Sequence, residues 1–210
     1  MQSALPKQFL EINGTPVLMH TIRAFHLYSP ALKIIVVLPA GQFDSWQQLT
    51  AQHQFTLPHM VVAGGESRFA SVENGLNAIG NDGLVAIHDG VRPLVSKQLI
   101  EDCFAAAAKT GSGVAAVAPN DSLRELNGGN KSVDRQRYRL VQTPQTFKTS
   151  LIKAAYAAAG AAGNVTDDAT VAERYGHKIT LVAGDYRNIK ITTPGDLLIA
   201  RALLDSFSTS

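Results

Sequence analysis

Short apolar runs alternate with longer amphipathic stretches through the first half of the chain. Continuous apolar runs are typical of strands covered on both faces, and between them apolar side chains recur at helical spacing. Strands that alternate with helices in this way predict an α/β fold, with a mainly parallel sheet and flanking helices. The expected strands are residues 33–39, 59–65, 83–88 and 113–119, and the expected helices are residues 17–28, 43–53, 67–79 and 96–109.

The alternation stops at Asp121. Polar side chains alternate in the residues that follow, and "NGGN" at 127–130 is a strong signal for a hairpin turn. A polar ribbon of this length has little core of its own, so we expect it to project and to pack on something else, such as a second subunit. We therefore expect one domain, residues 1–210, with residues 121–142 as an arm. Beyond the arm, the pattern predicts helices at 149–160, 167–176 and 195–207, and strands in "HKITLVAG" and "RNIKIT".

Composition narrows the range of functions. Apolar residues make up 45% of the 210 residues, which is enough for a core, and the net charge of +2 is too small to indicate nucleic-acid binding. No apolar run is long enough to span a bilayer, and the N-terminus lacks the pattern of a signal peptide. Cys103 is the one cysteine, so no internal disulfide can form. These features predict a soluble cytoplasmic protein without nucleic-acid or membrane partners.

The third predicted strand ends in a concentration of charge. In "LVAIHDGVRPLV" the apolar residues are followed at once by His88, Asp89 and Arg92. Ligands of open α/β sheets bind beyond the carboxyl ends of the strands, so we expect a binding site here. Plainer interpretations remain: an Asp-Gly pair is commonly only a turn, and a lone histidine is commonly a hydrogen-bonded structural residue.

The second predicted strand ends in glycines, within "AGGESRFAS". Glycine lets a backbone approach a ligand closely. Glu66 can accept hydrogen bonds from an amino group, and Ser67 or Ser71 can donate them. Because the carboxyl ends of neighbouring parallel strands lie close together, these residues are candidates for contact with the same ligand.

Five cations lie next to a glycine, a proline or a predicted strand end. Phosphoryl and nucleotidyl transfer depend mainly on positioning and charge neutralisation. Several cations with one or two aspartates, and without an evident Cys or Ser nucleophile, fit that chemistry better than acyl transfer or proton abstraction. Arg68, at a helix start, is also open to interpretation as a solvated cation, and no Cys or His spacing suggests a zinc site. The five cations are Lys7, Arg68, Arg92, Arg135 and Lys190.

Several motifs occur together in one order. They are "PKQFLEINGTPVLMHTIRAF", "GGESRFASVENGL", "IHDGVRPLVS", "VQTPQTF", "TDDA" and "NIKITTPGDL". With these motifs the chain closely resembles the 2-C-methyl-D-erythritol 4-phosphate cytidylyltransferases of the non-mevalonate isoprenoid pathway, over about residues 5–204. Ribitol 5-phosphate cytidylyltransferases share "PKQ", "HDGVRP" and "TPQTF" and are the alternative within the superfamily.

The resemblance implies a reaction, a fold and a partner. CTP and 2-C-methyl-D-erythritol 4-phosphate would give CDP-methylerythritol and pyrophosphate, through in-line attack of the substrate phosphate on the α-phosphorus of CTP. The fold would be a Rossmann-like sheet with an extended arm that clasps a second subunit, so that a homodimer shares its active sites. Mg²⁺ would be bound with the CTP phosphates and mostly by water, without a metal site made of protein ligands.

The resemblance also implies catalytic roles for three cations. Lys7 of "PKQ" matches a lysine that neutralises CTP phosphates, and Lys190 of "NIK" matches a second lysine, beside the α-phosphate. Arg135 matches an arm residue that holds the methylerythritol phosphate in the neighbouring subunit's site.

Substrate-binding residues follow from the same resemblance. Gly65, Glu66 and Ser71 match the positions that contact cytosine. Asp89 and Arg92 match a pair at the strand end, near the ribose and the reacting phosphates. Ser122 matches an arm position, and Thr143 matches the threonine of the "TPQ" motif. Ser122 stands where threonine is frequent in the family.

One departure from the family pattern concerns the beginning. The family opens with an apolar strand and a Gly-rich loop that ends in an Arg-Met pair and wraps the triphosphate with backbone N–H groups. Met1 stands where that methionine is expected, so the strand, the loop and the arginine are absent from the sequence, and we expect a truncated start rather than a real loss of the phosphate-binding loop. A catalytically inactive fragment that still dimerises through its arm is therefore the non-enzyme alternative.

Overall fold

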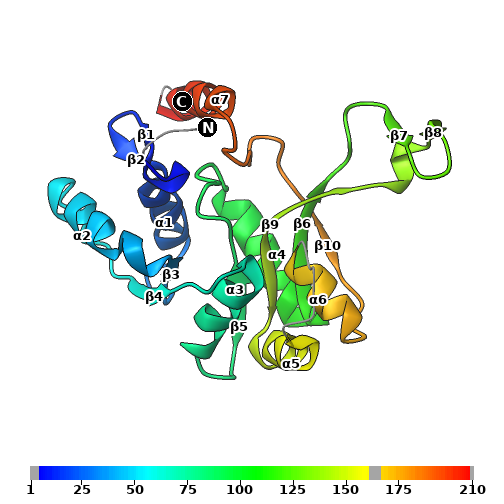
Figure 1. Ribbon diagram of the computed structural model, residues 1–210, viewed down its shortest axis with the longest axis horizontal. Coiled ribbons are helices and arrows are strands. Elements are labelled where there is room, and N and C mark those ends of the chain that lie inside the picture. Colours follow the sequence, from blue (N-terminus) through cyan, green and yellow to red (C-terminus); the bar gives the residue numbers. More distant parts are fainter. Residues whose placement is uncertain (1–4, 161–166, 209–210) are drawn as a thin grey trace.

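A mixed four-stranded sheet forms the centre of the computed structural model, which describes residues 5–160 and 167–208 (Figure 1). Neighbouring strands β10 and β6 run parallel, whereas β9 runs antiparallel to β6 and β5. The α/β class is confirmed, and the sheet is mixed because the chain leaves β6 into the arm and returns as β9. The strand order is β10 (Leu181–Ala183), β6 (Ser112–Val117), β9 (Leu140–Lys148) and β5 (Leu84–Ile87).

Helices cover both faces of this sheet. Successive residues of a strand point to opposite faces, and on β6 Val114 packs with α5 (Thr149–Ala159) and α6 (Asp168–Arg174), whereas Ala115 packs with α4 (Lys97–Thr110). α4 lies so close that a Cβ at Gly113 would be 2.2 Å from the Cys103 carbonyl oxygen, so only glycine fits there.

The N-terminal elements form a second, smaller layer. β3 (Ile35–Leu38) and β4 (Met60–Ala63) form a separate parallel pair in the described part of the chain. Phe9, Met19 and Trp46 belong to the apolar cluster beneath this pair. The remaining elements are the hairpin β1 (Glu11–Ile12) and β2 (Thr15–Pro16), the helices α1 (Val17–Tyr28), α2 (Phe43–Gln52), α3 (Arg68–Asn77) and α7 (Pro194–Ser208), and the 3-10 turns at Lys7–Phe9, Ala40–Gln42 and Arg135–Arg137.

Two expectations about strands need correction. The sequence pattern did not predict β9, because "VQTPQTF" is polar and contains a proline, yet residues 142–147 are all buried. The ladder with β6 is irregular between Val114 and Ala116, beside Pro144, as expected for a proline within a sheet. Conversely, "RNIKIT" was predicted to be a strand, and this prediction is wrong: the segment forms no ladder, and its polar groups instead face the strand ends described below.

The predicted hairpin is confirmed. β7 (Leu123–Glu125) pairs antiparallel with β8 (Lys131–Val133), and Gly128 and Gly129 in the turn between them have φ of 77° and 123°, where glycine is favoured. Figure 1 shows this hairpin projecting from the body on two long connecting segments. Leu126, Tyr138 and Leu140 of the arm are exposed.

No helix in the described residues is both long enough and apolar enough to cross a membrane.

Candidate active site

The charged residues after β5 form one cluster with a segment a hundred residues further along the chain. Asp89 Oδ2 lies 3.2 Å from Arg92 Nε and 3.1 Å from Lys190 Nζ. Arg92 also donates from Nη1 to the Asn188 carbonyl oxygen at 2.8 Å. The fold therefore brings together Asp89, Arg92 and Lys190, three of the residues expected from the sequence.

These three side chains differ in how far they can reach a ligand. Asp89 and Arg92 are 16% and 11% exposed, and each holds the other in place, whereas the Lys190 side chain is 45% exposed. Burial alone would raise the pKa of Asp89, but the positive charges of Lys190 and Arg92, with His88, outweigh burial and hold the pKa below its ordinary value. Asp89 is therefore an anion at neutral pH that orients Lys190, and the lysine presents its charge to solvent.

His88 and Thr143 fix the backbone of this cluster. His88 Nε2 lies 3.1 Å from the Arg92 carbonyl oxygen, which can only accept, so Nε2 carries the proton. His88 Nδ1 then accepts from the Thr143 hydroxyl at 3.1 Å, and the same hydroxyl accepts from the Asp89 N–H at 3.0 Å. Thr143 is 4% exposed, so it touches Asp89 from beneath the surface. The plainer interpretation of His88, as a hydrogen-bonded structural residue, fits this geometry.

His88 should make stability depend on pH. Burial lowers the pKa of His88 to about 4, from an ordinary value of 6.5. The unfolded chain then binds more protons than the folded chain between these values, so the free energy of unfolding rises with pH across this window and falls as the pH drops through it. We expect His88 to contribute at most about 3 kcal/mol to that fall between pH 7 and pH 4.

Urea denaturation of wild type and His88→Asn at several pH values tests this prediction. Asparagine does not titrate, and its side-chain oxygen is an acceptor for the Thr143 hydroxyl. The free energy of unfolding of the variant should therefore change less between pH 7 and pH 4 than that of the wild type. His20, whose pKa is also lowered, first by burial, is present in both proteins and cancels in the comparison. An equal pH dependence of the free energy of unfolding in the two proteins would contradict the lowered pKa of His88.

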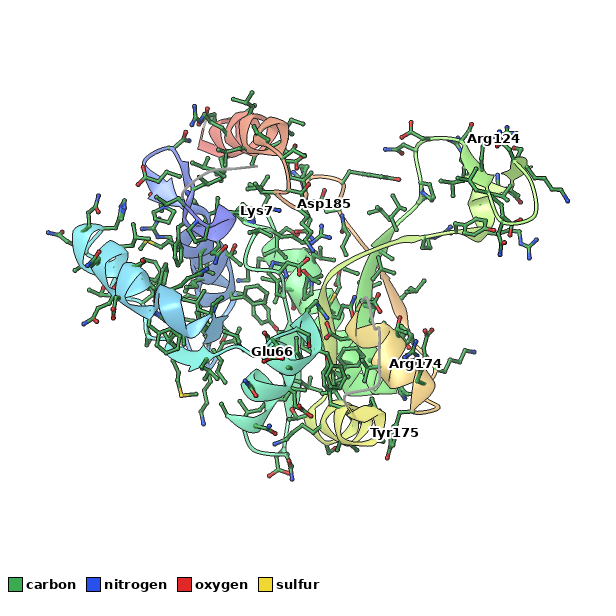
Figure 2. The ribbon with its side chains drawn as sticks, in the orientation of Figure 1. Lys7, Glu66, Arg124, Arg174, Tyr175 and Asp185 are labelled. Carbon is green, nitrogen blue, oxygen red and sulfur yellow. The ribbon has the colours of Figure 1, made fainter. Side chains whose placement is uncertain are left out.

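The glycine loop after β4 is tightly packed. A Cβ at Gly65 would lie 2.5 Å from the Ala70 Cβ, and one at Gly64 would lie 2.9 Å from Ser71 Oγ, so larger residues do not fit without movement. Ser71 Oγ accepts from the Gly65 N–H at 3.1 Å and donates to the Ser67 carbonyl oxygen at 2.8 Å. Glu66 is exposed in this loop, where Figure 2 labels it.

The other predicted site residues lie elsewhere in the chain. Lys7 is exposed in the first 3-10 turn, and in the view of Figure 2 it lies toward the side that carries Asp185. Ser122 and Arg135 are both exposed on the arm, where Arg135 donates to the Asn120 carbonyl oxygen. Figure 1 shows the hairpin of this arm, β7 and β8, projecting away from the central sheet. Of the "TDDA" motif, Thr166 lies outside the described residues, as does Met1.

Sequence reasoning missed two sets of residues. Asn188 is completely buried and donates from Nδ2 to the Thr143 carbonyl oxygen at 2.8 Å, which ties the Lys190 segment to β9. The signal for Asn188 in the sequence is the "NIK" motif, where Asn188 stands two residues before Lys190. The second is Asp168, which makes a bidentate ion pair with Arg68, one of the five candidate cations, so Arg68 is not simply solvated.

No group of three or more His, Cys, Asp and Glu that could hold a metal ion occurs in the parts of the chain described here. Asp89 is the carboxylate nearest the strand-end cations, and it is already paired with Lys190 and Arg92. These residues fit a metal that arrives on the phosphates of a ligand better than a metal held by protein ligands alone.

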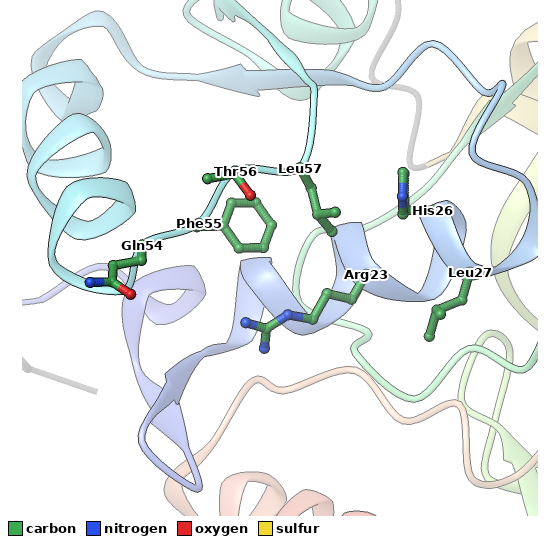
Figure 3. A pocket seen from close by; sticks show the side chains of 7 residues that line it. All are labelled: Arg23, His26, Leu27, Gln54, Phe55, Thr56 and Leu57. Atoms are coloured by element: carbon green, nitrogen blue, oxygen red, sulfur yellow. The ribbon is translucent and has the colours of Figure 1, made fainter.

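A cavity of about 310 Å³ lies apart from this site (Figure 3). It is formed by α1 and the segment that follows α2, and none of the strand-end residues lines it. Its lining residues are Arg23, His26, Leu27, Gln54, Phe55, Thr56 and Leu57. The predicted site residues Asp89, Arg92 and Lys190 therefore lie in the strand-end cluster and not in this cavity.

Comparison with known proteins identifies a family of matching length. The family model for IspD, 2-C-methyl-D-erythritol 4-phosphate cytidylyltransferase, matches residues 1–206. The enzyme of that name from Bacteroides thetaiotaomicron is 47% identical over 205 residues, which cover 97% of this chain and 93% of the relative. The one from Geobacillus kaustophilus is 39% identical over 209 residues, with coverage of 98% and 92%.

Solved structures agree with these sequence matches. The 2-C-methyl-D-erythritol 4-phosphate cytidylyltransferase of Thermus thermophilus is 35% identical, with a TM-score of 0.81, and the match covers 97% of this chain and 96% of that one. The 4-diphosphocytidyl-2C-methyl-D-erythritol synthase of Anaerococcus prevotii is 29% identical, with a TM-score of 0.85 and coverage of 97% and 92%.

Proposed function

The chain belongs to the 2-C-methyl-D-erythritol 4-phosphate cytidylyltransferase family, and on this premise we propose that its strand-end cluster carries the family reaction. The protein is a nucleotidyltransferase that transfers a cytidylyl group from CTP to 2-C-methyl-D-erythritol 4-phosphate, giving CDP-methylerythritol and pyrophosphate. The comparisons do not favour the ribitol 5-phosphate enzyme or an inactive fragment. The observation that carries the proposal is the placement of Lys190 by Asp89 and Arg92 beyond the end of β5.

The chemistry needs charge neutralisation more than covalent catalysis. An oxygen of the substrate phosphate forms a bond to the α-phosphorus of CTP, the bond between that phosphorus and the α–β bridging oxygen breaks, and pyrophosphate leaves with the electron pair. Negative charge builds on the α-phosphoryl oxygens and on the leaving group. Lys190, oriented by Asp89 and exposed on its other side, is placed to stabilise this charge, and we assign Lys7 to the leaving phosphates.

Arg92 and Asp89 have supporting roles in this proposal. Asp89 fixes the direction of Lys190 and is assigned to the ribose, and Arg92 prevents Asp89 from turning away. Thr143 acts on the same group through its hydrogen bond to the Asp89 N–H.

The glycine loop should select the base. A carboxylate at Glu66 accepts a hydrogen bond from the amino group of cytosine but repels the carbonyl oxygen that uracil carries there. Gly65 and Ser71 are assigned to the same contact, Gly65 through its backbone and Ser71 through the hydrogen bonds that hold the loop. A pocket built around hydrogen bonds discriminates against analogues that leave buried groups unpaired.

We therefore expect kcat/KM to be at least about tenfold higher with CTP than with UTP, or about 1.4 kcal/mol. Steady-state release of pyrophosphate, with methylerythritol phosphate as the acceptor, measures both values. Glu66→Gln should narrow the preference, whereas Glu101→Gln on the exposed side of α4 should leave it unchanged. Equal use of the two nucleotides by the wild type would contradict the assignment of Glu66.

The arm is proposed to complete a partner's site. An exposed hairpin with exposed apolar side chains and little core of its own fits a segment that packs on a second copy of the chain. In such a homodimer, Ser122 and Arg135 of one subunit would hold the methylerythritol phosphate against Lys190 of the other.

Mg²⁺ is proposed to enter with the nucleotide. When bound, it would add positive charge on the triphosphate, and it prefers to keep several water ligands. Asp89 is the carboxylate that pairs with Lys190 and Arg92 in the strand-end cluster. Calorimetry without nucleotide should show no tight Mg²⁺ binding, and a micromolar site in the free protein would contradict this proposal.

The cytoplasm is the compartment in which we propose that the reaction takes place. The single cysteine is a free, buried thiol, which suits a reducing compartment. Cell fractionation followed by immunodetection tests this, and recovery of the protein outside the cytoplasmic fraction would contradict it.

A further inference from the structure

Arg68, three residues after Gly65 of the glycine loop, forms an ion pair with Asp168, and we infer that this ion pair positions the loop for nucleotide binding. Arg68 is the first residue of α3 and follows Ser67, which caps the helix by accepting from the Ala70 N–H at 3.1 Å. Arg68 is thus a positioning residue for CTP, and the inference rests on the proposed assignment of the loop to the base.

The contact is strong and specific in its geometry. Arg68 Nη1 lies 3.0 Å from Asp168 Oδ1, and Nη2 lies 2.5 Å from Oδ2, a bidentate arrangement that a lysine cannot reproduce. Asp168 is 0% exposed, and the Arg68 side chain is 36% exposed. Burial would lower the pKa of Arg68, but Asp168 outweighs burial and raises it, so the guanidinium stays charged.

Local contacts cannot supply the same positioning. The hydrogen bonds of Ser71 and Ser67 connect residues within the loop and the first turn of α3, so they determine the shape of the loop. They do not determine where the loop lies relative to the main sheet, because β4, which leads into it, belongs to the separate β3–β4 pair. Arg68 crosses that boundary at the first residue of α3, to a residue 100 positions away, and the apolar side chains Phe69 and Leu76 of the same helix cross it by packing on the main core.

The far end of the ion pair is itself connected to the strand-end cluster. Asp168 begins α6, and the next residue, Ala169, donates from its N–H to Gln145 Oε1 at 2.8 Å. Gln145 lies on β9, two residues from Thr143, whose hydroxyl holds the Asp89 N–H. Through the Arg68 ion pair, the proposed base-binding loop is therefore connected to β9, the strand that also holds the strand-end cluster.

Loss of this positioning should weaken nucleotide binding more than it slows the chemical step. A preorganised loop binds more tightly because less ordering remains to be done on binding. We expect Arg68→Lys to raise KM and the dissociation constant for CTP about tenfold, to reduce the preference for CTP over UTP, and to change kcat by less than about threefold.

Tyr156→Phe is the matched control. The Tyr156 hydroxyl donates at 2.5 Å to Asp168 Oδ1, the oxygen that also accepts from Arg68 Nη1. The Tyr156 ring stacks on Phe69 with the centroids 4.5 Å apart. The phenylalanine removes one hydrogen bond from Asp168 but keeps the ring contact and the ion pair. If the network were only structural, both variants would lower the melting temperature and leave the CTP affinity of the folded protein unchanged.

The experiment combines calorimetric titration of CTP and UTP, steady-state kinetics and thermal melts for wild type, Arg68→Lys and Tyr156→Phe. Weaker CTP binding and a smaller CTP preference in Arg68→Lys alone support the inference. Unchanged affinity and preference in a folded Arg68→Lys overturn it. If Arg68→Lys does not fold, Arg68→Gln is measured by the same two criteria. Turnover by the wild type tests the proposed function separately, because the binding titrations do not depend on turnover.

Discussion

Replacement of Lys190 by alanine should lower kcat/KM for CTP by about 10²- to 10³-fold, the range typical for removal of one group that stabilises transition-state charge. Lys190 is the exposed cation of the strand-end cluster, and Asp89 holds its ammonium at 3.1 Å. The alanine variant also leaves Asp89 with one cation fewer, so the negative charge there would repel phosphates. Steady-state pyrophosphate release at saturating methylerythritol phosphate measures the loss.

Arg187→Ala is the matched control for this change. Arg187 is an exposed cation three residues earlier in the same segment and pairs with Asp185 at 2.8 Å. Exposed ion pairs contribute little to stability, so the fold should tolerate the loss of Arg187. Because Arg187 is not a proposed site residue, kcat/KM should change by less than about threefold. Similar losses in the two variants would mean that general positive charge, and not the placement of Lys190, supports the reaction.

A mixture of two inactive variants should recover activity if the arm serves a neighbour's site. Arg135→Ala removes the arm cation, and Lys190→Ala removes the strand-end cation. Random exchange gives heterodimers with one intact and one doubly defective site, so about a quarter of all sites should become active. Activity is measured before and after the two proteins are mixed under conditions that allow subunit exchange.

Two controls make the mixing result decisive. Arg137→Ala changes the same exposed turn of the arm without removing a proposed site residue, and it should remain active alone. Native mass spectrometry of two differently tagged preparations shows whether exchange has taken place. Demonstrated exchange without recovered activity would contradict a shared site and would indicate that each chain works alone.

Much of the fold could be predicted because periodicity reports burial. The continuous apolar runs that predicted strands became β3, β4, β5 and β6, of which β6 is buried along its whole length and β4 is only partly buried. The spacing of Phe69, Val72 and Leu76 reports one face of α3. β9 could not be predicted in this way, because Thr143 and Gln145 are buried through hydrogen bonds and not through apolar contact. Burial by hydrogen bonding leaves no hydrophobic pattern.

The candidate site was predictable only in part. The position of Asp89 and Arg92 after a strand indicated a site, since ligands bind at strand ends. Their partners could not be inferred from spacing, because Lys190 and Asn188 come from a segment about a hundred residues away that forms no ladder. Arg68 was open to interpretation as a solvated cation for the same reason: nothing near it in the sequence indicates Asp168.

The central claim is that this strand-end site directs attack on the α-phosphorus of CTP. Phosphorus NMR of a reaction that contains the purified chain, Mg²⁺, CTP and methylerythritol phosphate tests it directly. The predicted products are pyrophosphate and a CDP-alcohol whose diphosphate retains the phosphate of the substrate, in equal amounts. Formation of CDP with a doubly phosphorylated alcohol, or release of orthophosphate without a CDP-alcohol, would show attack at another phosphorus and would contradict the claim.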